Sequence, residues 1–408
     1  MSLNLQRWIK ISLINLLIVA TLGVILRYKI AFSLPFIDQK HLLHGHSHFA
    51  FAGWISQAIM TLLVAYLSKQ NPTARLRKYQ WLLYGNLFTA YAMLIAFPVE
   101  GYGLFSIIFS TCSIFVSYIF MVIYWKDLNK LKENNPAHSW FKTAILLNSF
   151  SSLGAFALAI MMAAKIVHQN WYLAAEYFYL HFQYNGWFFF ACMGLIVSKL
   201  SVIVSPEKLK RIFLLFAGAI APAYFLSTLW MHIPVWVYIL IVVAAFAQVF
   251  GWMYTIYLIK SNTTKLAFTP ISKWLFIFSG IALSIKLLLQ LGSTIPSLST
   301  LAFGFRPIVI GYLHLVLLGV TTIFLLGYMF VINTFTISKT TAISAGIFIA
   351  GIIINEIFLM TQGVSALTYI TIPFINEALL LAALIMFIGL LILITNLKLN
   401  TEDDFNHN

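Results

Sequence analysis

The feature that most constrains this chain is a series of long apolar segments. A membrane-spanning helix needs about 20 mostly apolar residues, whereas a strand of a membrane barrel needs about 10 with alternating character. Only 9% of the residues are charged, compared with roughly 25% in a soluble domain. We therefore predict an all-α, polytopic membrane protein with twelve transmembrane helices, forming a single helical bundle domain over residues 1–408 in a lipid bilayer. The twelve predicted spans are 9–31, 43–67, 79–98, 102–125, 142–164, 173–198, 211–230, 234–259, 272–292, 307–332, 341–361 and 377–397.

The distribution of positive charge predicts the orientation of these spans. The chain has 25 Lys and Arg residues against 11 Asp and Glu residues, which gives a formal net charge of +14. If the N-terminus is cytoplasmic, all but six cations lie in cytoplasmic segments, as cytoplasmic loops of membrane proteins require. The six are Arg27, Lys29, Lys40, Lys165, Lys286 and Arg306. We predict that both termini are cytoplasmic. We expect no nucleic-acid partner, because the excess positive charge is explained by the cytoplasmic loops.

Histidines near the outer ends of three spans form the main candidate site. His44 and His48 lie four residues apart in the second span, and therefore on one helix face. His181 lies in the sixth span and His314 in the tenth. With the orientation above, His48, His181 and His314 all lie roughly 8–13 Å below the outer edges of their helices. Imidazole is a common ligand of transition metals and of haem iron, so these three are candidate metal ligands. The alternative is that each histidine only bonds a neighbouring helix.

A glycine follows each of these histidines by five residues, at Gly53, Gly186 and Gly319. One interpretation is that glycine lets a flat macrocycle approach the backbone closely. The other is that small residues pack at helix interfaces in membranes. Apart from this spacing we find no convincing internal repeat in the sequence.

Histidines in the second, sixth and tenth of twelve spans resemble the catalytic subunit (subunit I) of the haem–copper oxidase superfamily, which includes the nitric oxide reductases. The resemblance implies a low-spin haem, b-type by expectation, held by His48 and His314, with His44 as the alternative ligand in the second span. Arg27 resembles the arginine of the family's first helix, which faces that haem. The resemblance also implies an oxidoreductase that accepts electrons from a cytochrome c-type or quinol donor, in the bacterial inner membrane.

The chain departs from the family pattern where the family holds its second metal centre. Tyr312 stands where the first histidine of the tenth-helix pair is expected, and Pro222 is followed by Ala223 and Tyr224 instead of two histidines. Tyr184 and Asn185 align with the sixth-helix His-Asn, which leaves His181 one turn earlier. A second centre with copper or iron is thus in doubt. If one exists, its candidate catalytic residues are His181, Tyr184, Tyr224 and Tyr312.

Two other functions remain open from the sequence. The external His-rich run of the second span is compatible with a transporter of Zn²⁺ or Cu²⁺, and the substituted ligands are compatible with a non-catalytic sensor or assembly protein. Lys286 and Glu356 also lie within spans, where ionisable residues are costly and usually face the interior. A buried Lys and Glu are cheapest as a pair, or with the lysine neutral.

Overall fold

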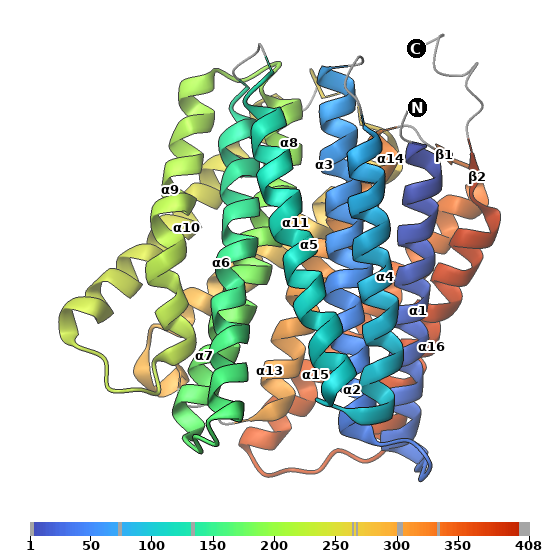
Figure 1. Ribbon diagram of the computed structural model, residues 1–408, viewed down its shortest axis with the longest axis vertical. Coiled ribbons are helices and arrows are strands. Elements are labelled where there is room, and N and C mark those ends of the chain that lie inside the picture. The colour runs from blue at the N-terminus through green and yellow to red at the C-terminus, as the bar shows by residue number, and fades with distance from the viewer. Residues whose placement is uncertain are drawn as a thin grey trace. The chain divides into compact units, whose positions relative to one another are not determined.

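The computed structural model describes residues 4–71, 76–131, 135–262, 265–266, 268–299, 305–332 and 335–399. It is all-α except for one short antiparallel pair, β1 (Phe335–Thr336) with β2 (Lys398–Leu399). Helices occupy all twelve segments predicted to span the membrane (Figure 1). Among the described residues, eleven helices are long and apolar enough to cross a membrane. The all-α, multi-pass prediction is therefore confirmed.

Most spans are single helices: α1 (Leu5–Phe32), α4 (Arg77–Glu100), α5 (Leu104–Leu128), α6 (Ala137–Ala163), α10 (Val235–Ser261), α11 (Pro270–Gly292), α15 (Lys339–Leu367) and α16 (Ile375–Asn396). A further span joins α9 (Pro206–Tyr224) to the 3-10 turn η3 (Phe225–Thr228). Proline at position 222, inside α9, lacks the amide hydrogen of a normal helical bond.

The segment Gln169–Leu200 is the predicted span that falls outside the eleven. It is helical throughout, through α7 (Gln169–His181), η2 (Phe182–Phe188) and α8 (Phe189–Leu200). Glu176, His181, Gln183 and Asn185 lower its hydropathy. His181, Gln183 and Asn185 are buried within the protein and are therefore not turned to lipid, whereas Glu176 is exposed.

Three spans widen from α-helix to π-helix near their middle. These π-segments are η1 (Phe49–Ser56), between α2 (Gln39–His48) and α3 (Gln57–Gln70); η2; and η5 (Leu315–Thr322), between α13 (Arg306–His314) and α14 (Ile323–Val331). Long π-helix is rare and is frequently found at functional sites. Each π-segment begins at the residue after a candidate histidine, namely His48, His181 or His314.

The π-segments also reveal an internal repeat, which corrects our interpretation of the sequence. They begin at residues 49, 182 and 315, a constant interval of 133 residues. The helices before and after them follow the same order, with four spans in each of the ranges 5–128, 137–261 and 270–396. Three copies of a four-helix repeat therefore build the chain.

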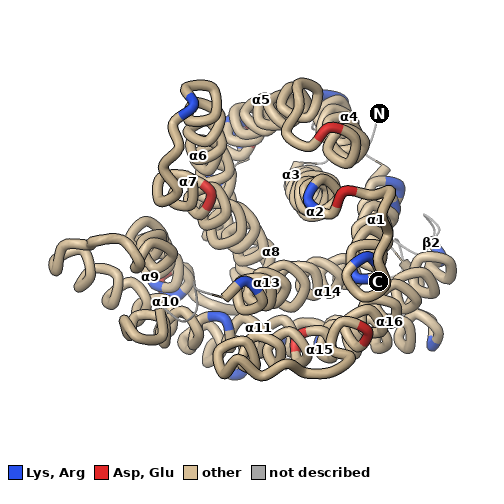
Figure 2. The backbone as a smooth tube through the Cα atoms, turned by 90° about the horizontal axis from the view of Figure 1, so that it is seen from below, with Lys and Arg blue, Asp and Glu red and all other residues tan. Residues whose placement is uncertain are grey.

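Residue contacts divide the chain into two compact units. Unit 1 holds residues 1–120, 268–278 and 322–408, and unit 2 holds 121–267 and 279–321. In unit 1, α15 packs along α16, and α16 along α1. In unit 2, α6 packs on α7 and α8, and α9 on α10. Charged residues are sparse along the helices of both units (Figure 2).

Candidate functional site

In unit 1, the helix that carries the histidine cluster begins at a side-chain cap. The Asp38 carboxylate accepts a hydrogen bond from the backbone N–H of His41 at 2.8 Å. This bond lowers the pKa of Asp38, which lies outside the membrane-spanning segments. The cap fixes where α2 starts and hence which residues share its faces.

His44 and His48 lie beside the same tyrosine. The His48 ring stacks on Phe97, with centroids 4.2 Å apart, and its Nε2 lies 3.5 Å from the Tyr102 hydroxyl. The His44 ring meets Tyr102 edge-on at 4.6 Å. His44 Nε2 is buried and has no hydrogen-bond partner in the part of the chain that the structure describes. A 3.5 Å contact is a weak hydrogen bond, so both Nε2 atoms retain capacity for a ligand.

Polar side chains from neighbouring helices satisfy the backbone that π-segment η1 leaves open. Asn15 of α1 donates to the carbonyl of Gly53, and Tyr91 of α4 donates to Asn15 Oδ1 at 2.8 Å. Asn86 donates to the carbonyl of Ala52 at 3.0 Å and to Gln57 Oε1 at 2.8 Å. Departures from the α-helical bond pattern are retained where such groups re-satisfy freed carbonyls. These bonds stabilise the π-helical backbone of η1, which begins at the residue after His48.

We expect Asn86→Leu to destabilise the folded protein by about 1–3 kcal/mol, because it leaves a buried carbonyl without a donor. Thermal unfolding of the purified protein in detergent measures the effect. Asn396→Leu is the matched control, since Asn396 is exposed and bonds only within its own helix. Equal losses of stability in the two variants would contradict a specific role for the bond to Ala52.

In unit 2, His314 has a defined tautomer. Its Nδ1 lies 2.8 Å from the carbonyl oxygen of Ile310, one turn earlier in α13. A carbonyl only accepts, so Nδ1 carries the hydrogen and Nε2 carries the lone pair. This backbone bond is the usual way in which proteins orient a metal-binding imidazole.

His181 is held differently, with both ring nitrogens in hydrogen bonds. Its Nε2 donates to the carbonyl of Ile220 at 2.8 Å, and its Nδ1 therefore accepts from Asn185 Nδ2 at 3.1 Å. The ring is also fully buried. In this arrangement His181 bonds α7 to α9 and offers no lone pair to a metal, as the helix-packing alternative predicts.

The repeat explains why the three histidines differ. Asn185 stands four residues after His181, whereas Ala52 and Leu318 stand four residues after His48 and His314. Only the asparagine donates to an imidazole one turn away. The 133-residue interval between the three histidines is visible in the sequence. It can be recognised as a repeat only once the π-segment after each histidine is known.

The three candidate tyrosines all lie in unit 2. Tyr184 meets Tyr312 edge-on at 6.2 Å and hydrogen-bonds Ser227. Tyr224 lies 6.0 Å from the His181 ring, and its hydroxyl donates to the carbonyl of Ala174 at 2.9 Å. No group of three or more His, Cys, Asp or Glu residues in the described ranges is close enough to hold a metal ion. These tyrosines pack between helices and bring no second imidazole to His181.

Arg27 interacts electrostatically with Glu356 of α15, in unit 1. Asn355 donates to Glu356 Oε1 at 3.2 Å. The sequence left the partner of Glu356 open, and the structure places Arg27 of α1 within electrostatic range of it.

The glycines five residues after each histidine accommodate neighbouring side chains. A Cβ atom added to Gly53 would lie 2.6 Å from the Phe49 ring, and one added to Gly186 would lie 2.9 Å from Leu147 Cβ. At Gly319 it would lie 3.1 Å from Ala282 Cβ. All three therefore serve close packing of side chains, which favours the helix-interface interpretation.

Comparison with protein-family models and with curated protein sequences finds no match to this chain. The resemblance to the haem–copper oxidases accordingly rests on the residues and topology described above.

Proposed function

We propose that this chain is a membrane-bound haem protein of the bacterial inner membrane that transfers electrons. His48 and His314 are the proposed axial ligands of a low-spin b-type haem, with His44 as the alternative to His48. The contrast among the three repeats carries the proposal. Four residues after the histidine, two copies have the apolar residues Ala52 and Leu318, and the third has Asn185, which donates to His181.

The donor chemistry of this chain fits haem iron. His314 carries its hydrogen on Nδ1, which directs the Nε2 lone pair outward from its own helix backbone. His44 Nε2 is a buried polar atom without a partner among the described residues, and burying such an atom is unfavourable unless something binds it. Arg27 lies in unit 1, within electrostatic range of Glu356.

A haem with two imidazole ligands has no open iron position, and it therefore supplies one-electron transfer and not gas binding. Reduction of O₂ or NO would require a second centre, and His181 is already bonded on both nitrogens. We infer an electron-transfer role with a cytochrome c-type or quinol donor, and no second copper or iron site.

Visible spectra of the purified protein, oxidised and reduced, together with iron, copper and zinc counted per chain, test this function. We expect the sharp, split bands of a low-spin haem and one iron per chain. Stoichiometric zinc without haem would instead support a metal transporter. A protein with neither would overturn the proposal and favour a non-catalytic sensor or assembly role.

We also propose twelve spans with both termini in the cytoplasm, supported by the helix at Gln169–Leu200 and by the cation distribution. In a background without Cys112 and Cys192, Phe36→Cys and Glu207→Cys place one thiol in each of two exposed segments. In right-side-out spheroplasts, an impermeant maleimide is expected to label the first thiol and spare the second. Labelling of both would mean that Gln169–Leu200 does not cross the membrane, and labelling of the second alone would reverse the orientation.

A further inference from the structure

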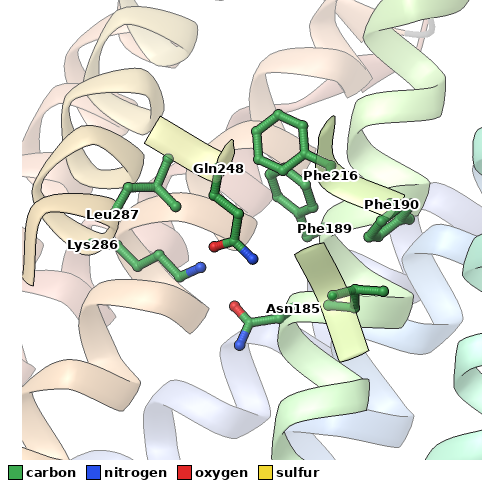
Figure 3. A pocket seen from close by; sticks show the side chains of 8 residues that line it. Asn185, Phe189, Phe190, Phe216, Gln248, Lys286 and Leu287 are labelled. Atoms are coloured by element: carbon green, nitrogen blue, oxygen red, sulfur yellow. The ribbon is translucent and has the colours of Figure 1, made fainter. Parts of the chain in front are cut away.

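Unit 2 contains a small cavity lined by a buried amine and two side-chain amides. Lys286 of α11, Gln248 of α10 and Asn185 of η2 point toward one another in it (Figure 3). Phe189, Phe190 and Phe216 form part of the apolar wall. The space suffices for about one water molecule, and polar groups surround it, which are the two conditions for a bound water.

The amine of Lys286 has no direct partner among the residues that the structure describes. The residue is only 5% exposed, and within the described ranges it makes neither a hydrogen bond nor an ion pair. The one titratable side chain in electrostatic contact with it there is His181, and the side chains facing it from α10 and η2 are uncharged amides. An ammonium inside a membrane without a counter-ion is expensive, so such a residue is a functional candidate.

The orientation of Asn185 follows from the bonds of His181. Ile220 supplies a carbonyl acceptor, so His181 Nε2 is the donor and Nδ1 the acceptor. Asn185 must present its NH₂ group to Nδ1, which turns Oδ1 toward the cavity. A water in the cavity thus meets an acceptor from Asn185 and an amine from Lys286.

We propose that Lys286 is a proton-exchange site, with the cavity water as its immediate proton carrier. The Nζ lone pair forms the new N–H bond, the electron pair of the broken O–H bond stays on the water oxygen, and the hydroxide so formed regains a proton from bulk water, so that the net change is the uptake of one proton by Lys286. The oxygens of Gln248 and Asn185 stabilise the ammonium, through the water where they are too far for direct bonds. The positive charge of Lys286 in unit 2 is therefore gained when the amine binds a proton and lost when the ammonium releases it. This inference stands independently of haem binding.

Nitrogen NMR of full-length protein labelled with ¹⁵Nζ-lysine, in lipid nanodiscs, distinguishes amine from ammonium directly. We expect one lysine resonance to convert between the two forms within the pH range in which the protein stays folded. That resonance is assigned by its absence in Lys286→Gln or, if that variant does not fold, in Lys286→Met. A Lys286 resonance that keeps one form over the whole range would overturn the proposal.

Gln248→Leu tests the role of the cavity. Removing one hydrogen bond to a charged group is expected to lower the proton affinity of Lys286 about tenfold. Gln183→Leu is the matched control, because Gln183 bonds Asn148 and Ser151 and does not line the cavity. An equal shift in both variants, or none in Gln248→Leu, would show that the cavity does not support the charge.

Discussion

The His314→Ala variant is expected to lose the low-spin haem spectrum of the purified protein. Removing an axial imidazole leaves a high-spin iron with one protein ligand at most. Loss of groups that merely orient a ligand costs about 10–100-fold in affinity, so loss of the ligand itself should exceed that range. Iron per chain after purification, together with the spectrum, measures the effect.

His181→Ala is the matched control for this experiment. His181 occupies the equivalent position of the repeat, but its nitrogens bond Ile220 and Asn185. We expect its variant to retain the low-spin bands while losing thermal stability. Retained bands in His314→Ala, or their loss in His181→Ala alone, would show that the ligands are assigned to the wrong copies. Separate His44→Ala and His48→Ala variants identify the ligand of the second span.

The Gly389→Ala variant is expected to be markedly less stable than the unsubstituted protein. Glycine 389 of α16 lies against the backbone of α15, where an added Cβ would approach Phe348 N to 2.6 Å and its Cα to 2.9 Å. Backbone atoms cannot turn aside, so the two helices must separate. Overpacking a tight interface costs about 1–3 kcal/mol, and small residues at helix contacts are what allow such an approach in membranes. Thermal unfolding and the yield of monodisperse protein are the measurements.

Gly346→Ala provides the comparison, because among the described residues no atom outside the local backbone of α15 lies within 4 Å of the Cβ that it would add. Alanine favours helix over glycine by about 1 kcal/mol, so this variant should be unchanged or slightly more stable. If both variants behave alike, close approach of α15 and α16 is not what Gly389 provides.

The helices could be predicted from the sequence because a bilayer of fixed thickness sets the minimum length of any apolar segment that crosses it. Each of the twelve predicted ranges overlaps a helix, including 173–198, which is too polar to meet the apolarity of the other eleven. Here hydropathy and structure differ because most of residues 182–200 are buried within the protein.

Contacts between polar groups on different helices could not be predicted in the same way. The electrostatic interaction of Arg27 with Glu356 links residues over 300 positions apart, and the bond from His181 to the carbonyl of Ile220 involves a backbone atom. Such contacts depend on how each helix is rotated about its axis. Nearly uniform apolar sequences carry little information on that rotation, because no hydrophilic face distinguishes one side of the helix.

The π-segments have a consequence for how each of these spans presents its two ends. A hydrogen bond from residue i to i+5 encloses one more residue than an α-helical bond, and one residue corresponds to about 100° of rotation in an α-helix. The half of the span after η1, η2 or η5 is therefore turned relative to the half that ends at the histidine. A side-chain pattern extrapolated through the whole span would place the second half on the wrong neighbours. The two halves of such a span can thus face different packing partners.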